Sequence, residues 1–366
     1  MTMREVQIAV VGAGPAGLAA SVEAARKGAQ VLVMDEQLEP GGQLYKQIHK
    51  FFGSREHLAG VRGFDIGRQM LAEAQGLGVE ILLDTVVQGI CDGNTLFAVT
   101  RGEPLLVMAQ RAIVATGANE NNLYFPGWTL PGVMGAGAAQ TMMNVHMVLP
   151  GKRMLMVGSG NVGLIVAYQA LLAGGEVKML IEAAPRIGGY GVHAAKLARA
   201  GVPIRTSHTI LGAWGDRQVE GATVAQVDKD WKPVPGTEVD LEVDVICVAV
   251  GLRPLIEVAL MAGSRAAWFP ALGGHFPAHN ERMETSVPGV FVAGDVAGVE
   301  EASTAMEEGR LAGLSAAWSL GLISDDCYHA EARDIQGRLE ALRSGPFGAA
   351  RRQAKAAILE GEGILA

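Results

Sequence analysis

Cysteine is scarce in this chain of 366 residues, which contains three: Cys91, Cys247 and Cys327. They lie far apart in the sequence, so no CxxC or CxxxxC pair occurs. This spacing argues against a dithiol relay between neighbouring cysteines. It also excludes an iron-sulfur cluster held by this chain, because such a cluster needs four cysteine ligands or histidine replacements. We expect three lone, buried thiols.

Long hydrophobic runs and an excess of positive charge are also missing. The apolar stretch VEILLDTVVQGI is interrupted by Asp84 and Gln88, so we expect no membrane span. The formal net charge of −8, without a basic stripe, argues against nucleic acid or an anionic membrane as a partner. The N-terminus leads directly into an apolar strand pattern without a cleavable leader, which predicts a cytoplasmic protein.

The sequence offers no convincing set of metal ligands. His275 and His279 have an HxxxH spacing, but they lie in a stretch that reads as a loop and have no third ligand nearby. We therefore expect no metal site.

Glycine, in contrast, is abundant, with 49 residues dispersed through a chain that is 49% hydrophobic and 19% charged. This composition is typical of a compact globular protein. The length suggests two domains, or one domain inserted into another. We interpret the glycines as tight turns and as places where the backbone approaches other backbone or a ligand.

Two segments show the same strand, helix, strand pattern. The first has an apolar strand at 6–11, a helix at 15–28 and an apolar strand at 31–35. The second repeats this order at 152–157, 161–174 and 177–182. Continuously apolar strands are typical of buried parallel sheets. The pattern predicts an α/β fold with two Rossmann-like dinucleotide-binding domains.

The first glycine cluster, GAGPAG, lies between a predicted strand and a predicted helix. Gly12 permits the turn, Gly14 lets a pyrophosphate approach the backbone, and Gly17 allows the helix to pack on the strand. The pyrophosphate would lie at the positive end of the helix. Asp35, at the end of the next strand, is the expected ribose ligand, with Glu36 as the alternative.

The second cluster, GSGNVG, has the same context and ends with Glu182 after the next strand. A carboxylate there binds ribose hydroxyls and repels a 2′-phosphate, which favours NAD(H) over NADP(H). Arg186 could instead serve a phosphate, and the site could hold another adenine nucleotide such as ATP, or none. The residues predicted to form this second site are Gly158, Gly160, Asn161, Val162, Gly163 and Glu182.

A late strand, PGVFVAGD, indicates that the second domain is an insertion. It is apolar, ends in Gly-Asp and precedes a helical pattern, as expected for a strand that returns to the first domain. We expect a first nucleotide-binding segment at 1–120, the inserted domain at 121–252, the returning segment at 253–330 and a helical tail at 331–366. For Arg351, Arg352 and Lys355 in this tail we expect a solvated helix, with docking on an acidic partner as the alternative.

Five motifs together resemble the two-dinucleotide-domain flavoprotein reductases in order and spacing. They are GAGPAG with Asp35, EPGGQL (39–44), IVATGA (113–118), GSGNVG (158–163) and TSVPGVFVAGD (285–295). The GGQL form is similar to that of thioredoxin reductases. The resemblance covers about residues 6–320 and implies that the first site binds FAD.

Two longer stretches carry a narrower resemblance. GGQLYKQIHKFFG (41–53) and FPGWTLPGVMGAGAAQ (125–140) are similar to the flavoprotein α subunits of heteromeric amino-acid dehydrogenases and oxidases. That family includes sarcosine oxidase, dye-linked proline and hydroxyproline dehydrogenases, opine oxidases and hydrogen cyanide synthase. Its α subunit occurs with a second flavoprotein, the amino-acid-oxidising β subunit, often with a small iron-sulfur protein. The resemblance implies such partners here, with any iron-sulfur step on another polypeptide.

The resemblance also implies roles for individual residues toward FAD. Asp295, after Gly294, would bind a ribityl hydroxyl, with an N-cap role as the alternative. The helix that begins near Ser303 and Thr304 would point its N-terminus at the N1/O2 side of the flavin. The remaining implied contacts are Gly12, Gly14, Pro15, Ala16, Gly17 and Asp35 with the adenosine diphosphate, Val86 with adenine, and Gly42, Gln43, Leu44, Thr116 and Gly117 beside the ribityl chain and flavin.

The leading functional hypothesis is an FAD-binding electron-transfer α subunit of an amino-acid dehydrogenase complex. It would pass hydride or electrons between its flavin, a nicotinamide or adenine nucleotide and the redox centre of a partner. Hydride transfer at flavin N5 requires alignment more than an acid or a base, so no catalytic side chain is assigned. The alternative is a stand-alone NAD(P)H:acceptor oxidoreductase, or diaphorase.

Overall fold

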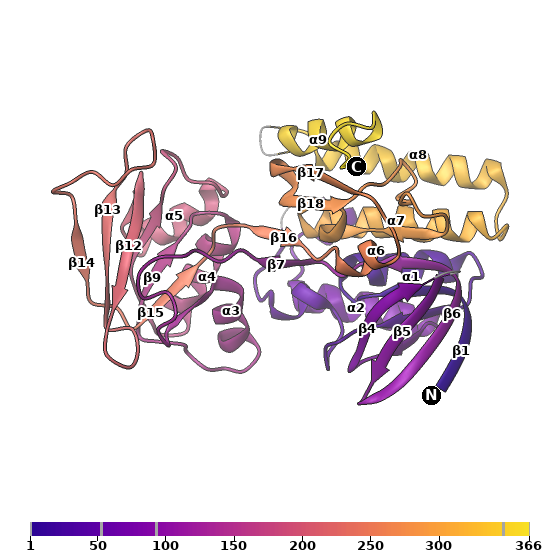
Figure 1. Cartoon of the computed structure of the whole chain (residues 1–366), viewed down its shortest axis with the longest axis horizontal. Coiled ribbons are helices and arrows are strands. Elements are labelled where there is room, and N and C mark those ends of the chain that lie inside the picture. The colour runs from indigo at the N-terminus through magenta and orange to yellow at the C-terminus, as the bar shows by residue number, and fades with distance from the viewer. Residues whose placement is uncertain (1, 52–53, 92–93, 346–347, 366) are drawn as a thin grey trace. The chain divides into compact units, whose positions relative to one another are not determined.

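The computed structural model describes residues 2–51, 54–91, 94–345 and 348–365. Phe52 and Gly53, which end the GGQLYKQIHKFFG motif, lie outside the described residues. The chain forms two compact units (Figure 1). Unit 1 consists of Met1–Asn119 and Arg253–Ala366, and unit 2 consists of Glu120–Leu252. The second unit therefore lies between two segments of the first in the sequence.

Unit 1 is built on one sheet, to which seven strands contribute among the described residues. Its parallel strands are, in order, β3 (Glu80–Leu82), β2 (Val31–Met34), β1 (Thr2–Val11), β6 (Glu103–Val114) and β19 (Val290–Val292). Its antiparallel strands are β5 (Thr95–Thr100), paired with β6, and β4 (Thr85–Cys91).

The long strand β6 explains how the late strand returns to this sheet. Its first half pairs with β5 through residues 103–108, and its second half pairs with β19 through residues 112–114. The strand PGVFVAGD thus joins the sheet of the first nucleotide unit in parallel with β6. This brings residue 294 to the same edge of the sheet as the GAGPAG turn, because the carboxyl ends of parallel strands meet there.

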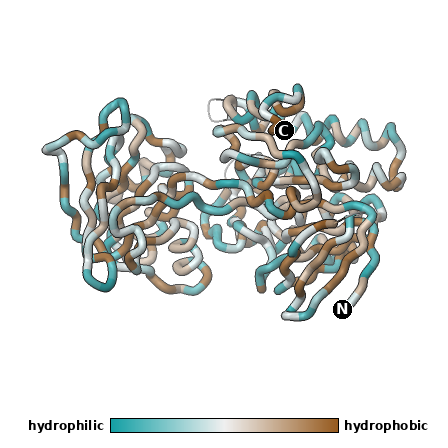
Figure 2. The backbone as a smooth tube through the Cα atoms, in the orientation of Figure 1, coloured by the Kyte–Doolittle hydropathy of each residue, from teal (hydrophilic) through white to brown (hydrophobic). Residues whose placement is uncertain are grey.

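The core of unit 1 follows from strands that are covered on both faces. Ile8 to Val11 are all buried, as expected for a central parallel strand. Figure 2 shows hydrophobic segments along the strands of this sheet. The predicted strand at 6–11 begins earlier, at Thr2, because the pairing with β6 extends to that residue.

The helices of unit 1 are α1 (Pro15–Arg26), α2 (Gly63–Gly76), α6 (Glu257–Met261), α7 (Ala302–Ser319), α8 (Asp325–Leu342) and α9 (Ala349–Leu359). Helices α1 and α7 pack almost backbone to backbone. A Cβ atom at Gly309 would lie 2.2 Å from the carbonyl oxygen of Ala16, and one at Gly313 would lie 2.2 Å from that of Ala20. These glycines therefore fix the position of α7 against α1.

Unit 2 contains a second parallel sheet and a smaller antiparallel sheet. The parallel strands are, in order, β11 (Ile204–Thr206), β10 (Glu176–Glu182), β9 (Arg153–Val157), β15 (Val245–Val248) and β8 (Val133–Gly135). The antiparallel strands are β12 (His208–Trp214), β13 (Gly221–Gln226) and β14 (Val239–Leu241). The helices are α3 (Ala136–Asn144), α4 (Asn161–Leu172) and α5 (Gly191–Arg199).

The structure also has short strands and turns. Two strand pairs are β7 (Ala118–Glu120) with β16 (Leu252–Pro254), and β17 (Ala266–Phe269) with β18 (Gly274–Pro277). The short 3₁₀ turns are at Gly42–Lys46, Arg55–His57, Pro270–Leu272 and Gly294–Ala297. His275 therefore lies in a strand, and its assignment to a loop from sequence was wrong.

Two further expectations from sequence were wrong. Lys355 is buried rather than part of a solvated helix, and its Nζ donates to the carbonyl oxygen of Ala297 at 2.8 Å. Of the three thiols expected to be buried, Cys91 is exposed and Cys327 is partly buried, whereas Cys247 is buried. Burial, with a contribution from Glu120, raises the pKa of the Cys247 thiol to about 12.

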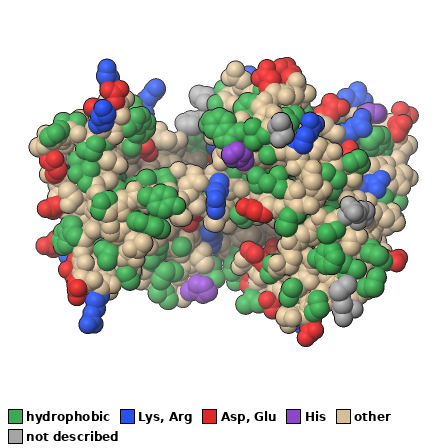
Figure 3. Space-filling model, in the orientation of Figure 1, with side chains coloured by type: hydrophobic (Ala, Val, Ile, Leu, Met, Phe, Trp, Pro, Cys, Tyr) green, Lys and Arg blue, Asp and Glu red, His purple; other side chains and the backbone are tan. Residues whose placement is uncertain are grey.

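Two surface properties bear on partners. Acidic and basic side chains are scattered over the face shown in Figure 3, without a continuous basic stripe on that face. Among the described residues, no helix has the length and apolar character needed to cross a membrane.

Candidate functional site

The turn after β1 requires glycine at its first position. Gly12 has φ +105°, a conformation that other residues rarely adopt. Its N–H donates to the carbonyl oxygen of Met34 at 2.7 Å, and a Cβ atom there would lie 2.4 Å from the carbonyl oxygen of Ala115. Gly12 is therefore explained by backbone packing among β1, β2 and β6.

The other two glycines of GAGPAG differ in what surrounds them. A Cβ atom at Gly17 would lie 1.8 Å from the carbonyl oxygen of Gly12, so the fold itself requires glycine there. Gly14 is the N-cap of α1 with φ −74°, and a Cβ atom there would meet nothing closer than Gly42 Cα at 4.0 Å. The fold does not require glycine at Gly14, whereas a diphosphate lying against the helix N-terminus would require it.

The Gly-Gly pair of EPGGQL packs beside this turn. The N–H of Gly41 donates to the carbonyl oxygen of Ala13 at 2.8 Å, and a Cβ atom at Gly42 would lie 2.9 Å from Gly14 Cα. The side chain of Leu44 is buried in the core, and Gln43 is exposed. Gly42 therefore lies beside the GAGPAG turn and the N-terminus of α1, which we call the cradle of unit 1. The Leu44 side chain instead points into the core.

Asp35 stabilises the glycine turn directly. Its carboxylate accepts hydrogen bonds from the N–H groups of Ala13 at 2.5 Å and Gln37 at 2.8 Å. Burial raises the pKa of this carboxyl, against the lowering effect of the two N–H groups. Each oxygen keeps a further lone pair for a ribose hydroxyl. Glu36, the alternative, is exposed and accepts from the Gln37 side chain at 3.2 Å.

The returning segment also packs beside the glycine turn. The N–H of Ala293 donates to the carbonyl oxygen of Val114 at 3.1 Å, and a Cβ atom at Gly294 would lie 2.7 Å from Ala16 Cβ. Asp295 follows in a short turn, where its carboxylate accepts from the N–H of Glu300 at 3.3 Å. Asp295 is not the N-cap of α7, because that position is Glu301.

The environment of Asp295 raises the pKa of its carboxyl. Burial, with the nearby carboxylates Glu308, Glu301 and Glu300, raises its pKa to about 6, against the effect of the Glu300 N–H. A carboxyl with such a pKa can exchange hydrogen bonds with a hydroxyl either as donor or as acceptor.

The remaining residues predicted to contact FAD lie in different settings. The Thr116 hydroxyl donates to the carbonyl oxygen of Leu255 at 2.6 Å, and the carbonyl oxygen of Gly117 accepts from the N–H of Leu255 at 2.9 Å. Val86 on β4 is 39% exposed. In the first turn of α7, Thr304 is buried and Ser303 is partly buried.

Unit 2 repeats the arrangement of the glycine turn. Gly158 has φ +108°, and a Cβ atom there would lie 2.2 Å from the carbonyl oxygen of Ala249. A Cβ atom at Gly163 would lie 2.2 Å from the carbonyl oxygen of Gly158. A Cβ atom at Gly160, the N-cap of α4, would lie more than 4 Å from any neighbouring atom. Backbone packing again requires the first and third glycines, whereas a Cβ atom at the second would meet no neighbouring protein atom.

Glu182 occupies the same place in unit 2 as Asp35 in unit 1. Its carboxylate accepts from the N–H of Ser159 at 2.9 Å, from the Ser159 hydroxyl at 2.6 Å and from the N–H of Ala184 at 2.9 Å. The side chain of Asn161 accepts from the N–H of Tyr190 at 2.8 Å, and Val162 is exposed. These contacts hold the second turn in place.

Sequence reasoning missed one feature of unit 2. Gly188 and Gly189 follow Glu182 at the spacing with which Gly41 and Gly42 follow Asp35. The second glycine of this pair, Gly189, donates its N–H to the carbonyl oxygen of Ser159 at 2.8 Å, whereas in unit 1 the first glycine, Gly41, donates to that of Ala13. The signal was present in the sequence as a repeated acid to Gly-Gly spacing.

Among the residues that the structure describes, no group of three or more His, Cys, Asp or Glu side chains could hold a metal ion. What the arrangement offers is main-chain N–H groups at two helix N-termini, each beside a carboxylate. This chemistry suits the binding of a nucleotide diphosphate and its ribose.

Comparison with known proteins agrees with this geometry. The family model described as pyridine nucleotide-disulphide oxidoreductase matches residues 6–309. An opine oxidase subunit of Rhizobium meliloti (strain 1021) is 30% identical over 355 residues, which cover 91% of this chain and 75% of that protein. Hydrogen cyanide synthase subunit HcnB of Pseudomonas aeruginosa is 29% identical, over 86% of this chain and 71% of the relative. The alpha subunit of sarcosine oxidase from Rhizobium meliloti (strain 1021) is 29% identical over 86% of this chain, but this covers 30% of that protein.

Solved structures show the same fold. Thioredoxin reductase of T. acidophilum superposes with a TM-score of 0.71 at 22% identity, covering 87% of this chain and 99% of that one. L-proline dehydrogenase from P. horikoshii superposes with a TM-score of 0.69 at 21% identity, covering 91% of this chain and 59% of that one. The expected thioredoxin-reductase-like arrangement of two dinucleotide-binding folds is thereby confirmed.

Proposed function

The chain belongs to the pyridine nucleotide-disulphide oxidoreductase family, and from this premise we propose that it is the FAD-binding, electron-transfer subunit of a heteromeric amino-acid dehydrogenase or oxidase. Family membership implies FAD and a nicotinamide-dinucleotide-binding domain. The finer assignment is supported by relatives that are named as subunits of opine oxidase, hydrogen cyanide synthase and sarcosine oxidase.

One observation carries the nucleotide-binding part of the proposal. In both units the second glycine has ordinary backbone geometry and open space, so packing does not explain it. A diphosphate against the N-terminus of α1 or α4 does explain it, because a side chain there would obstruct the N–H groups. The residues present therefore fit a dinucleotide at each cradle.

For FAD we assign the cradle of unit 1. The adenosine diphosphate would be held by the turn at 12–17 and by Asp35, and the ribityl chain by the segment around Gly42 and by Asp295. Bound flavin supplies hydride transfer at its N5 atom. The chain itself would bind and orient the cofactor, and the N-terminus of α7 would stabilise negative charge at the N1/O2 side. No side chain is assigned an acid or base role.

For the second cradle we propose NAD(H) or another adenine nucleotide. Glu182 would accept from the ribose hydroxyls and disfavour a 2′-phosphate, which supports NAD(H) over NADP(H). Its two oxygens already hold Ser159 and Ala184, so the carboxylate is oriented before the nucleotide binds.

The partner would be a second flavoprotein that oxidises the amino acid, with a small iron-sulfur protein as a further component. The sequence spacing of the three cysteines supports this division, because an iron-sulfur cluster would have to reside elsewhere. The alternative function is a stand-alone NAD(P)H:acceptor oxidoreductase, favoured by the carboxylate at Glu182.

The test combines nucleotide release with flavin reduction. Denaturing the purified protein should release FAD, and affinity purification from its native host should recover a second flavoprotein. The complex should oxidise an amino acid of the proline, hydroxyproline, sarcosine or opine type. A chain that purifies alone and whose flavin is reduced rapidly by NADH in stopped-flow measurements supports the alternative. A protein that takes up no FAD on reconstitution contradicts both functions.

A further inference from the structure

Two adjacent glutamates, Glu307 and Glu308, are buried on α7. A buried carboxylate is costly unless cations and hydrogen bonds compensate it. Glu308 has three partners: the N–H of Gly294 at 3.0 Å, Arg343 Nη2 at 2.6 Å and Lys355 Nζ at 2.8 Å. Glu308 thus joins the turn that carries Asp295 to two cations from the C-terminal part of the chain.

The two cations lie outside the segment that the family model matches. That match ends at residue 309, whereas Arg343 is the C-cap of α8 and Lys355 lies in α9. Both are also largely buried, with 12% and 7% of the side chain exposed, so water screens their charges little. The C-terminal helices therefore bring charge into the part of unit 1 that carries the proposed FAD site.

The same two cations hold the turn at further points. Lys355 donates to the carbonyl oxygen of Ala297 at 2.8 Å. Arg343 binds both carboxylate oxygens of Glu300: Nη2 donates to Oε1 at 2.6 Å, and Nε lies 3.0 Å from Oε1 and 3.1 Å from Oε2. The turn from residue 294 to residue 300 is consequently held at three points. Glu308 holds Gly294, Lys355 holds Ala297 and Arg343 holds Glu300.

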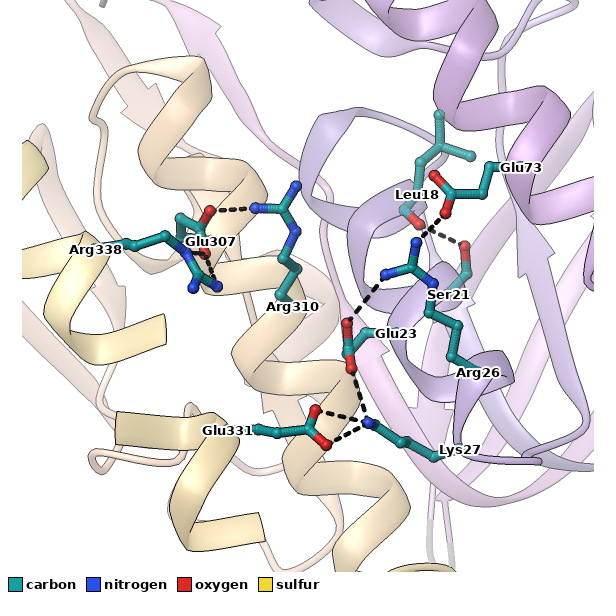
Figure 4. Close-up of polar contacts among 10 residues, drawn as sticks. All are labelled: Leu18, Ser21, Glu23, Arg26, Lys27, Glu73, Glu307, Arg310, Glu331 and Arg338. Carbon is teal, nitrogen blue, oxygen red and sulfur yellow. Dashed lines mark hydrogen bonds and ion pairs between the residues drawn. The ribbon is translucent and has the colours of Figure 1, made fainter. Parts of the chain in front are cut away.

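Helix α8 is anchored independently of this turn. Figure 4 shows Glu307 between Arg310 and Arg338, and Lys27 beside Glu331 of α8. Arg338 Nε lies 3.0 Å from Glu307, and Lys27 Nζ lies 2.6 Å from Glu331. These contacts attach α8 to both α7 and the end of α1, so Arg343 is presented from a supported helix.

The titration behaviour agrees with this pairing. Burial acts to raise the pKa of Glu308, but Lys355 and Arg343 outweigh it and hold that pKa below its usual range. Burial and the Lys355 charge lower the pKa of His279 to about 4, so this histidine adds no positive charge near neutral pH. Arg343 and Lys355 are thus the cations that pair with Glu308, and Arg343 also pairs with Glu300.

We propose that Arg343 and Lys355 are positioning residues for the flavin: acting through Glu308, they hold the Gly294 to Glu300 turn and compensate the buried negative charge of Glu308 near the flavin. This inference rests on the proposed function. It makes the C-terminal helices part of the cofactor site although neither cation is assigned a contact with FAD.

Two variants that break the same ion pair provide the test, because they change the charge in opposite directions. Lys355→Met leaves one uncompensated negative charge, which disfavours a reduced flavin, so the reduction potential of bound FAD should become more negative. Glu308→Gln leaves one uncompensated positive charge, so that potential should become more positive. Lys355→Met should also weaken FAD binding by about tenfold and speed hydrogen exchange at the Gly294 amide in the cofactor-free protein.

Arg352→Met is the matched control. It lies on the same helix as Lys355 and pairs with Glu340 at 3.0 Å, but both side chains are more than half exposed. We expect a wild-type potential, FAD affinity and Gly294 exchange rate. If Lys355→Met does not fold, Lys355→Arg should keep the wild-type potential while Glu308→Gln raises it.

Potentials that shift in the same direction in Lys355→Met and Glu308→Gln, or that do not shift, contradict the inference, since a merely structural role would not produce opposite signs. If Lys355→Met does not fold, an unchanged reduction potential in Glu308→Gln by itself contradicts the inference. A wild-type protein that takes up no FAD contradicts the proposed function instead, whereas unaffected variants of an FAD-loaded protein contradict only the positioning role.

Discussion

Glycines at equivalent positions of one motif serve different purposes in this chain. At Gly12 the positive φ and the nearby carbonyl oxygen of Ala115 exclude any side chain. At Gly14 neither obstacle exists, since the nearest atom to a Cβ would be 4.0 Å away. A substitution series across one turn can therefore separate a requirement of the fold from a requirement of the ligand.

We expect Gly14→Ala to change the free energy of unfolding by less than about 1 kcal/mol, because a Cβ atom fits. The same substitution should weaken FAD binding by about tenfold or more, because the methyl group obstructs the diphosphate. Gly12→Ala, the comparison, should lower the free energy of unfolding by about 3 kcal/mol. Urea denaturation of the cofactor-free proteins and FAD titration measure both effects. Equal FAD affinity in wild type and Gly14→Ala would contradict the assignment of the FAD diphosphate to this turn.

Asp295 predicts a specific pH dependence of stability. Its pKa is about 6 in the folded protein and near the ordinary 3.8 in the unfolded chain. The folded state therefore binds the proton more tightly, and the contribution of Asp295 to stability is fully present below pH 3.8 and is lost as the pH rises to about 6. The unfolding free energy of wild type minus that of Asp295→Asn should fall across this window in cofactor-free protein. A difference that is flat or rises with pH would contradict the raised pKa.

At the scale of elements, the decisive contact is that of α1 with α7. It places the turn before α7 beside the N-terminus of α1, since a Cβ atom at Gly294 would touch Ala16. The cradle therefore depends on how closely two helices from distant parts of the sequence can approach.

Gly309→Ala tests this approach. Alanine favours a helix by about 1 kcal/mol over glycine, but the clash with the backbone of Ala16 costs more, so we expect a net loss of about 1–2 kcal/mol of stability. The matched control is Gly337→Ala on α8, where a Cβ atom meets nothing within 4 Å. This variant should gain about 0.5–1 kcal/mol. Thermal or urea unfolding distinguishes the two, and effects of the same sign would refute the packing argument.

At the scale of the whole molecule, the chain carries a family fold without neighbouring cysteines. The family description refers to disulphide chemistry, yet the three cysteines lie in separate elements or units. Cys91 is exposed on β4, Cys247 is buried in β15 with a pKa of about 12, and Cys327 lies in the first turn of α8. A dithiol relay to the flavin is therefore not part of the proposed function.

A variant with Cys91→Ser, Cys247→Ala and Cys327→Ser should retain FAD and the wild-type rate of flavin reduction. Alanine is chosen at the buried position because a hydroxyl there would lack a partner. The reductant is NADH, or the partner flavoprotein with its amino acid, whichever reduces the wild-type protein. Loss of flavin reduction in a folded, FAD-loaded variant would show that a thiol takes part.

Local patterns in the sequence were sufficient for much of the fold. The apolar strands, the two glycine turns and the acids at Asp35 and Glu182 follow each other at short spacings, so the chain itself brings them together. The family resemblance is confirmed, and its ligand contacts stay predictions. The second Gly-Gly pair, Gly188 and Gly189, was within reach of the same reasoning.

The amino-acid sequence by itself determined two nucleotide-type units, because each is built from contacts between neighbouring segments with a fixed period. Only the tertiary structure decided where the side chains of Lys355 and Arg343 lie and which groups they pair with. From sequence they belong to a charged, helical tail. In the fold they reach the buried carboxylate of Glu308, because the compensation of a buried charge depends on which distant residues share a low-dielectric interior, and no local pattern encodes that.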